Sequence, residues 1–305
     1  MRRSGTIIAA ASAALASGLA QAADLEVVTA EPTIYVPNNF LWGGVYVGGF
    51  VGGGWGTADW GPGLVPITVT FTPTPTGAPV TTPVLVFTPH VNVPVNGFLG
   101  GGRIGVNYQA GAFVFGFEGD FAGMTLKGHA TGVFSGTTPS VKIATSSGTT
   151  PTSATVTYAG TSVYETPADW ATTLTGRVGY TFDRVLAYGK AGMSVEQDGD
   201  TEVSNTTFCQ VMDNVTKPTP PPRTCTGSLS RAGTATRYGW TAGAGLEYAF
   251  DKNWSAFAEY DHLGFLSHLV NLTVPGSAGT VAGTRLIALN IDRLVVGANY
   301  RFNQP

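Results

Sequence analysis

Residues 237–250 read RYGWTAGAGLEYAF, and their side chains alternate between two chemical types. The even-numbered positions are aromatic or aliphatic, whereas the odd-numbered positions are polar, charged or small. Because successive side chains of a β-strand point to opposite faces, this segment predicts a strand with one apolar and one polar face. Aromatic residues at both ends of the apolar face are typical of a strand that crosses a membrane with that face toward lipid.

A second strand of the same kind follows after a short turn. Residues 251–253 (DKN) favour a turn, and residues 254–261 (WSAFAEYD) place Glu259 and Asp261 on the face away from the tryptophan, tyrosine and alanines. The two segments together predict a hairpin of a transmembrane β-barrel. The composition agrees, since the chain has 42 glycines, 11% aromatic residues and only 11% charged residues.

The first residues have the features of an export signal. Arg2 and Arg3 precede an apolar stretch over residues 6–19, which ends in a small-x-small cleavage sequence at residues 20–22. This stretch is shorter than the roughly 20 residues that a spanning helix needs, which argues against an N-terminal membrane anchor. We therefore expect a signal peptide over residues 1–22 and a mature protein that begins at Ala23.

Eight segments of the mature chain have strand character, and short and long connections alternate between them. The candidate strands are residues 42–56, 96–109, 112–124, 169–182, 185–196, 237–250, 254–265 and 285–302. Short turns at one end and long loops at the other are typical of outer-membrane barrels, whose turns are periplasmic and whose loops are extracellular. The sequence thus predicts an all-β fold, an eight-stranded antiparallel up-and-down transmembrane β-barrel with long extracellular loops and short periplasmic turns.

This barrel is expected to occupy residues 42–302, between a periplasmic N-terminal linker over residues 23–41 and a C-terminal extension over residues 303–305. The long loops are rich in Thr, Pro, Val, Ser and Gly, as in residues 67–94 and 137–157. That composition is compatible both with hairpins that extend above the membrane and with mobile segments.

Aromatic residues lie near both ends of the candidate strands, as lipid interfaces require. The alternative, that they form the core of a soluble β-sandwich, is disfavoured by the export signal and by the asymmetry of the loops. The expected periplasmic girdle contains Trp42, Tyr108, Phe113, Tyr180, Phe182, Phe250, Trp254, Tyr300 and Phe302. The expected outer girdle contains Trp55, Phe98, Phe121, Trp170, Tyr238, Trp240 and Tyr260.

A belt of charged residues is expected inside the barrel, at a similar distance from the periplasmic turns. A first turn centred on residues 110–111 places Arg103 opposite Glu118, and the second turn places Arg177 opposite Lys190. These side chains could line an ion-conducting pore, or they could pair and fill the interior. The expected belt consists of Arg103, Glu118, Arg177, Lys190 and Glu259.

The number of strands favours a filled interior. Eight strands leave a lumen that side chains can fill, whereas open water channels have about sixteen strands. We therefore expect a structural and surface protein without a large pore, and a narrow porin-like channel for small solutes is the alternative. In the last candidate strand, the apolar positions of residues 287–291 are out of phase with those of residues 294–302, and a β-bulge near residues 292–293 would reconcile them.

Other kinds of chemistry have little support in the sequence. Net charge is −3, which gives no electrostatic case for binding nucleic acid. Glycines at positions 100, 102 and 105 match a dinucleotide-binding pattern, but they lie within a candidate strand and precede no helix. The four histidines lack metal-ligand spacing. We expect no cofactor and no metal site, and we expect a loop disulfide between Cys209 and Cys225 because the chain is exported.

A lipid-modifying enzyme is the catalytic alternative. Some eight-stranded barrels act on the acyl chains of lipid A with a serine, a histidine and a carboxylate, and Asp261, His262, Ser267 and His268 are close together in this sequence. No defined catalytic motif surrounds these four residues. We therefore expect no enzymatic activity and assign no catalytic residue.

The sequence resembles the small outer-membrane immunogenic β-barrel proteins of alphaproteobacteria, which belong to the wider OmpA-like, porin-family group of barrels. The resemblance covers most of the mature chain except the loops, although these loops are longer than is usual for the family and residues 303–305 follow the usual terminal aromatic residue. It is carried by VYVGG at 45–49, GFEGDF at 116–121, GRVGY at 176–180, GWTAGAGLEY at 239–248, NWSA at 253–256 and VGANYRF at 296–302.

The resemblance implies an outer-membrane location, surface antigenicity and contact with outer-membrane lipids and lipopolysaccharide. It also implies that the barrel-assembly machinery inserts the chain, and it suggests attachment of Ala23 to peptidoglycan. The ligand of the loops and the oligomeric state stay open.

Overall fold

The computed structural model describes residues 40–71, 80–143, 152–213, 223–224, 227–274 and 281–302. The chain divides into two compact units, residues 1–37 and 38–305, and all described residues lie in the second unit. Within the described ranges, no helix is long and apolar enough to cross a membrane. The expected signal peptide, most of the linker, Ala23 and the C-terminal extension lie outside the described residues.

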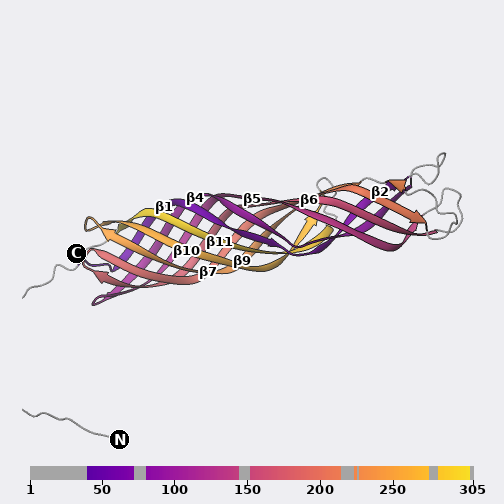
Figure 1. Cartoon of the computed structure of the whole chain (residues 1–305). Helices are drawn as coiled ribbons and strands as arrows, with labels where there is room; N and C mark the ends of the chain where they lie inside the picture. Colours follow the sequence, from indigo (N-terminus) through magenta and orange to yellow (C-terminus); the bar gives the residue numbers. More distant parts are fainter. Residues whose placement is uncertain are drawn as a thin grey trace, which may run out of the picture. The chain divides into compact units, whose positions relative to one another are not determined.

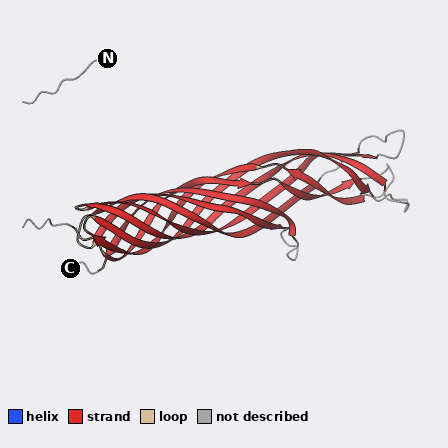
Figure 2. Ribbon diagram, turned by 90° about the horizontal axis from the view of Figure 1, so that it is seen from below, coloured by secondary structure: helices blue, strands red, loops and turns tan. Residues whose placement is uncertain are grey.

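Eight long strands form one closed antiparallel sheet (Figures 1 and 2). Around the ring they are β6 (Thr152–Phe182), β5 (Phe113–Ile143), β4 (Val91–Ala110), β1 (Gly44–Trp60), β11 (Val281–Arg301), β10 (Trp254–Thr273), β9 (Gly227–Ala249) and β7 (Val185–Asp213). Pairing of β6 with β7 closes the ring. The predicted eight-stranded antiparallel barrel is thus confirmed. A two-residue strand, β8 (Arg223–Thr224), pairs with β7, and β2 (Gly63–Phe71) and β3 (Val80–Thr88) form a separate hairpin.

The three predicted short turns are present, and two of them contain a residue with a positive φ. Gly111 has a φ of 63° and Asp183 has a φ of 55°, which are values that tight hairpin turns require. The first turn lies one residue later than expected, because Ala110 pairs with Phe113. This register places Arg103 opposite Asp120, so the expected position opposite Glu118 is wrong by two residues.

The strands continue far beyond the length that crosses a membrane. A tilted membrane strand needs about 9–11 residues, whereas β5 and β6 have 31 residues each. Much of the segment expected to be a long loop between residues 125 and 168 is therefore a continuation of the β5–β6 hairpin. β-branched residues such as Thr and Val favour strands, which explains why this composition extends the sheet. We call the part of the barrel beyond the outer girdle the extension.

The β2–β3 hairpin lies within the extension and packs against β5, β9 and β11. The backbone N–H of Phe87 on β3 donates to the hydroxyl of Tyr158 at 3.1 Å. The Arg285 guanidinium on β11 donates to the carbonyl of Gly61 at 3.3 Å and also to the Thr88 hydroxyl. The hairpin therefore covers the side of the extension where β10 and β11 end before β5, β6 and β7.

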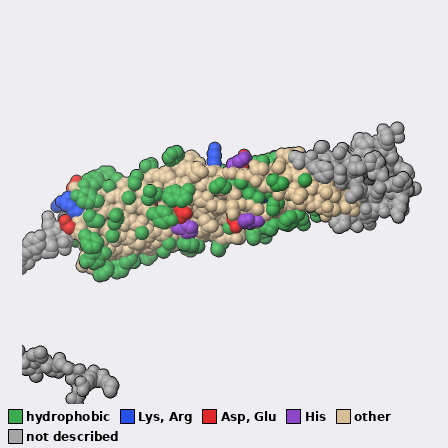
Figure 3. Space-filling view, viewed as in Figure 1, with side chains coloured by type: hydrophobic (Ala, Val, Ile, Leu, Met, Phe, Trp, Pro, Cys, Tyr) green, Lys and Arg blue, Asp and Glu red, His purple; other side chains and the backbone are tan. Residues whose placement is uncertain are grey.

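Hydrophobic side chains are spread over the face of the barrel seen in Figure 3, and charged side chains gather at the end that carries the short turns, with a few more and the histidines near the middle. Most residues expected in the two girdles are exposed, as lipid-facing residues must be. Examples are Tyr108 and Phe182 toward the short turns and Phe98 and Tyr238 toward the extension, with exposed fractions of 72%, 62%, 79% and 70%.

Trp42 is an exception, and its expected place in the periplasmic girdle is wrong. It is fully buried in the mouth of the barrel at the short-turn end, where it precedes Gly44 with a φ of 113°. Its backbone N–H donates to Oε1 of Gln109 at 2.6 Å, and its indole N–H donates to the carbonyl of Asp183 at 3.3 Å. The Arg301 guanidinium lies 4.7 Å from the centre of the Trp42 ring. Trp42 therefore closes the mouth.

The expected β-bulge near residues 292–293 is also wrong. The pairing of β11 with β1 runs without a shift from Ile287 to Arg301. Ile287, Leu289 and Ile291 face inward and are fully buried, because the barrel interior at this level is apolar. The register shifts are instead in the pairing of β10 with β11, the first between Phe265 and His268 and the second between Leu272 and Thr273.

Candidate functional site: the charged interior of the barrel

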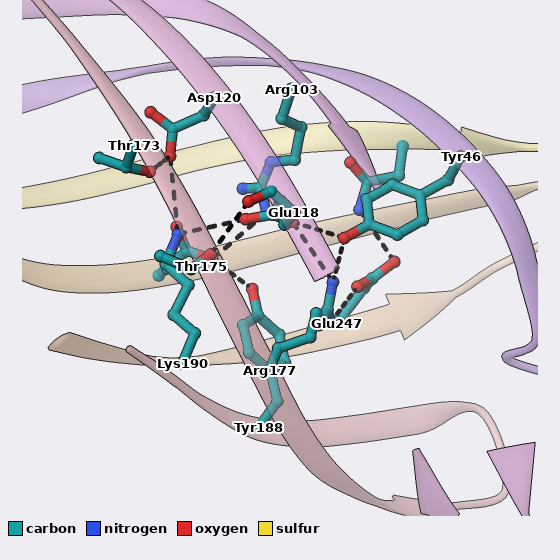
Figure 4. A network of polar contacts seen from close by, with 12 residues as sticks. Tyr46, Arg103, Glu118, Asp120, Thr173, Thr175, Arg177, Tyr188, Lys190 and Glu247 are labelled. Atoms are coloured by element: carbon teal, nitrogen blue, oxygen red, sulfur yellow. Dashed lines mark hydrogen bonds and ion pairs between the residues drawn. The ribbon is translucent and has the colours of Figure 1, made fainter. Parts of the chain in front are cut away.

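Ten charged side chains form a layer across the barrel interior near the short turns, which we call the lower charge layer. Figure 4 labels Arg103, Glu118, Asp120, Arg177, Lys190 and Glu247 from this layer. Each is at most 5% exposed. All five residues of the expected belt lie in this layer. Its cations are Arg103, Arg177, Lys190, Arg293 and Arg301, and its carboxylates are Glu118, Asp120, Glu247, Glu259 and Asp261. The layer is therefore balanced in formal charge.

Four members of the expected belt alternate in sign around the centre of the layer. Arg103 Nη1 lies 2.9 Å from Glu118 Oε2 and 3.2 Å from Glu259 Oε2. Lys190 Nζ lies 2.7 Å from Glu259 Oε1 and 3.2 Å from Glu118 Oε1. Each carboxylate thus bridges two cations, which is the arrangement that compensates buried charges.

The like-charged pair Arg177 and Lys190 lies directly opposite across β6 and β7, as the turn position predicts. The two side chains turn to different carboxylates: Arg177 donates to Glu247 at 3.1 Å, and Lys190 donates to Glu259 at 2.7 Å. The guanidinium of Arg177 also lies over the Tyr188 ring, 3.9 Å from its centre. Both cations also contact Glu118, at 3.4 Å from Arg177 and 3.2 Å from Lys190, so a shared carboxylate and one further carboxylate each offset the repulsion between them.

Two tyrosines reach into the layer across glycines of the neighbouring strand. Tyr46 pairs with Gly105 and donates to Glu118 at 2.6 Å. Tyr188 pairs with Gly245 and donates to Glu259 at 2.7 Å. A Cβ atom at Gly105 or Gly245 would collide with the facing tyrosine ring, which explains the need for glycine at these positions.

The remaining members of the layer extend the network to the last two strands. Arg293 on β11 donates to Asp120 at 2.8 Å and to Asp261 at 2.9 Å. Arg301 donates to Glu247 at 3.0 Å. Sequence reasoning did not include these residues in the belt, although their alternation with outward apolar residues carried the necessary signal.

An apolar layer follows the lower charge layer toward the extension. Its buried side chains come from β4, β5, β10 and β11, so they fill the lumen from several walls. Close packing of such side chains leaves no room for a wide aqueous path. Members of this layer include Leu99, Met124, Leu126, Leu263, Leu289 and Ile291.

A second set of buried charges lies within the extension, and sequence reasoning missed it. We call it the upper charge layer, and it consists of Glu196, Asp198, Asp200, Glu202, Arg231, Arg237 and Arg285. Four carboxylates at alternate positions of β7 face arginines of β9 and β11. Asp200 lies 2.7 Å from Arg237, and Glu202 lies 2.7 Å from Arg285. Residues 197–236 were expected to be a loop, but an acidic residue at every second position of 196–202 is a strand signal.

The residues of the catalytic alternative do not converge. Asp261 points inward and contacts Arg293, whereas His262 points outward and its Nδ1 lies 2.7 Å from Asp292 Oδ1. Ser267 and His268 are exposed at the irregular part of β10. No nucleophile, histidine and carboxylate of this group meet at one point. The expected disulfide lies outside the described residues, because these do not include Cys225.

Comparisons with known proteins give the following similarities. A family model described as "Outer membrane protein beta-barrel domain" matches residues 7–302. The 31 kDa outer-membrane immunogenic proteins of Brucella melitensis and Brucella suis are 27% identical over 172 residues, which cover 56% of this chain and 55% of each relative. The match thus spans about half the length of these curated relatives.

Two solved structures are also similar. The outer membrane protein OprG of Pseudomonas aeruginosa gives a TM-score of 0.35 at 11% identity, with 86% of this chain and 97% of that chain covered. The attachment invasion locus protein Ail of Yersinia pestis gives a TM-score of 0.28 at 11% identity, with 83% and 99% covered.

Proposed function

The chain belongs to the family of outer-membrane proteins with a β-barrel domain, and on that premise we propose that it is a structural and surface protein of the outer membrane. In this proposal the barrel stabilises the cell envelope and presents its extension to the exterior, without forming a large pore. The filled interior is the observation that carries the proposal. Both the lower charge layer and the apolar layer occupy the lumen.

The pairing within the lower charge layer supports this proposal over an ion-lined pore. A conducting pore needs charged groups that face water, whereas Lys190 is within 3.4 Å of Glu118, Glu259 and Asp261. Charges that satisfy one another in this way hold the strands together. The apolar layer next to them gives a permeating ion no polar partner, which is a large energetic barrier.

The length of the strands supports the role in surface presentation. About ten residues of each strand suffice to cross the membrane, so most of β5, β6 and β7 lies beyond it. The ion pairs of the upper charge layer and the β2–β3 hairpin hold this part together. An ordered extension of this kind holds its outer end at a distance from the lipid headgroups.

Planar-bilayer recording of the refolded protein tests the proposal. We expect no stable conductance from the natural protein. A variant with Leu99→Ala, Leu126→Ala, Leu263→Ala and Ile291→Ala thins the apolar layer and is expected to conduct, which shows that insertion and detection work. Lys127→Ala, on the exterior, is the matched control. Discrete currents from the natural protein that the four substitutions enlarge would support the narrow-channel alternative instead.

The proposed partners are lipopolysaccharide, the barrel-assembly machinery and peptidoglycan. The resemblance to the alphaproteobacterial family suggests attachment of Ala23 to peptidoglycan. Mass analysis of peptidoglycan digests is expected to find a muropeptide linked to a peptide that begins at Ala23. Digests that contain only unlinked Ala23 peptides would dispose of this attachment and would leave the proposal for the barrel unaffected.

A further inference from the structure

A groove of about 720 Å³ crosses the outer wall of the barrel over β6, β7, β9, β10 and β11, which are neighbours in the sheet (Figure 1). One row of cross-strand partners explains its shape. The side chains in the middle of this row are small, whereas those at its ends are large and about half exposed. The row consists of Val178, Gly189, Ala244, Tyr260 and Leu294.

The groove lies within the part of the barrel that crosses the membrane. Gly189 is four residues beyond Val185, where β7 begins, and Tyr260 is six residues beyond Trp254, where β10 begins. A membrane strand has about 9–11 residues, and in an outer-membrane barrel the outward surface at this level faces lipid. The volume of the groove also falls within the roughly 300–1,000 Å³ of typical small-molecule sites. An acyl chain is therefore the occupant that fits its chemistry and size.

A polar group of three side chains begins where the groove ends, and we call it the polar trio. It consists of Tyr260, His262 and Asp292. The Tyr260 ring lines the groove, and its hydroxyl donates to Asp292 Oδ1 at 2.6 Å. His262 Nδ1 lies 2.7 Å from the same oxygen. The Trp240 ring lies 5.2 Å from the His262 ring, and Trp55 is the cross-strand partner of Asp292, so residues of the outer girdle flank the trio.

The polar trio lies closer to the short turns than the outward charges on the other side of the barrel. His262 is eight residues beyond the start of β10, whereas Lys127 is fourteen residues beyond Phe113, where β5 begins. The trio is thus within the length that crosses a membrane, where ionisable side chains are costly and mark functional sites. A polar lipid headgroup at this level would compensate them.

We propose that the groove and the polar trio together bind one lipopolysaccharide molecule, with an acyl chain of lipid A in the groove and its phosphorylated sugar on the trio. The inference rests on the proposed function, because the extension must be outside for the trio to meet the outer leaflet. Both contacts within the trio use Asp292 Oδ1, so Oδ2 accepts a hydrogen bond from a sugar hydroxyl. Protonated His262 donates from Nε2 to a phosphate oxygen.

The shape of the wall favours lipid over a second copy of the chain. The outer wall of a barrel is convex, so two barrels touch along a narrow line. A second copy would therefore leave the small residues between Val178 and Tyr260 uncovered. A flexible acyl chain follows the hollow and covers Gly189 and Ala244, while its headgroup stays next to His262.

Native mass spectrometry tests the groove. The full protein is refolded in detergent with equal amounts of lipid A and phosphatidylethanolamine, and we expect one lipid A per barrel, in several-fold excess over phosphatidylethanolamine. Gly189→Leu fills the groove without a backbone clash, since a Cβ atom there would meet only the Gly243 carbonyl oxygen, at 3.8 Å. We expect this variant to retain several-fold less lipid A.

Gly49→Leu is the matched control for the groove. Gly49 is exposed on β1, and a Cβ atom there would meet only the Gly101 carbonyl oxygen, at 3.7 Å. We expect this variant to retain lipid A as the natural protein does. Equal retention by the Gly189 and Gly49 variants, with a heat-dependent gel shift showing that both are folded, overturns the proposal.

Removal of the polar trio tests the headgroup contacts. His262→Ala with Asp292→Ala is expected to abolish the preference for lipid A over phosphatidylethanolamine, because the groove still accepts an acyl chain of either lipid. His129→Ala with Glu165→Ala is the control, since these residues form another outward pair, at 3.9 Å. A preference that survives the loss of His262 and Asp292 overturns the proposal.

Two further outcomes are distinguished in the same preparations and in cells. A dimer mass that Gly189→Leu abolishes would assign the groove to a second copy and overturn the proposal. Protease added to intact cells tests the orientation separately. Preference for phosphatidylethanolamine, together with an extension that protease cuts, overturns this inference and leaves the proposed function standing. An extension that is cut only after the outer membrane is permeabilised contradicts the proposed function itself.

Discussion

Tyr46 and Tyr188 show how single small residues shape the barrel interior. Each ring lies across a glycine of the adjacent strand, which lets its hydroxyl reach a carboxylate at the centre of the lower charge layer. Glycines of the predicted strands thus also determine where large inward side chains fit, since Gly105 leaves room for Tyr46 and Gly245 leaves room for Tyr188. The sequence predicted five of the ten charges of this layer but not the tyrosines, because an inward tyrosine has no charge to mark it.

Gly105→Val is expected to destabilise the barrel because its side chain collides with the Tyr46 ring. Overpacking of this kind costs about 1–3 kcal/mol. Gly102→Val is the matched control, because Gly102 is on the same strand and faces outward, and a Cβ atom there would meet only the Gly48 carbonyl oxygen, at 3.5 Å. Urea unfolding in lipid vesicles measures both. Equal loss of stability in the two variants would contradict the role of Tyr46.

Lys190→Met is expected to be much more damaging than Lys127→Met. Removal of Lys190 takes one of three cations from Glu118 and one of two from Glu259 in a buried site, and breaking a buried pair costs about 3–5 kcal/mol. Lys127 is exposed, and surface substitutions stay within about 0.5 kcal/mol. The midpoint of urea unfolding is the measurement. A Lys190 variant as stable as the Lys127 variant would show that the layer is hydrated.

The ends of the strands near the short turns could be predicted from the sequence, whereas their ends in the extension could not. Near the short turns, aromatic residues and a strict alternation define the faces, and the predicted starts at Val185 and Trp254 agree with the structure. Beyond the membrane both faces become polar or small, so the alternation that marks a lipid-facing strand disappears. The β-bulge near residues 292–293 was predicted wrongly for a related reason. The inward apolar residues 287–291 have the same pattern in the sequence as lipid-facing residues.

The upper part of β7 is expected to make the stability of the extension depend on pH. Burial raises the pKa of Asp200 to about 7, although a hydrogen bond from Thr166 acts in the opposite direction. The unfolded carboxyl has a pKa of about 4, so between these values the folded state holds a proton that the unfolded state releases. This contribution to stability is therefore complete below about pH 4 and is lost as the pH rises to about 7.

Hydrogen exchange of β6 and β7 within the extension measures this effect. Protection, after correction for intrinsic exchange, is expected to fall between pH 5 and pH 8 in the natural protein. Asp200→Asn keeps the shape of the side chain but cannot titrate, so its protection is expected to change less over the same range. Identical pH profiles would show that Asp200 is ionised throughout.

At the scale of the whole molecule, the barrel consists of a membrane-spanning part and an extension with separate charge layers. Each layer has its own ion pairs, and the apolar layer lies between them. The sequence predicted the strands of the membrane-spanning part and five of the charged residues that the structure places in its interior. It did not predict the extension, because the β2–β3 hairpin and the upper charge layer depend on contacts between residues far apart in the chain.

Replacement of residues 62–89 by a short Gly-Ser linker is expected to loosen the extension and to spare the membrane-spanning part. The deletion removes the Thr88 partner of Arg285 and the cover over β9 and β11, but no strand of the closed ring. Protease added outside vesicles is expected to cut the upper parts of β5 to β9, while the heat-dependent gel shift of the barrel persists. A variant that loses this gel shift would show that the two parts fold as one unit.

Trp42 contacts residues that lie far from it and from one another along the chain. Its indole and backbone contact Asp183 in a hairpin turn, Gln109 at the end of β4 and Arg301 at the end of the final strand. This set of contacts is therefore complete only when Arg301, the last residue of β11, lies beside Trp42. Burial of the Trp42 indole is therefore expected to mark a barrel in which β11 has paired with β1.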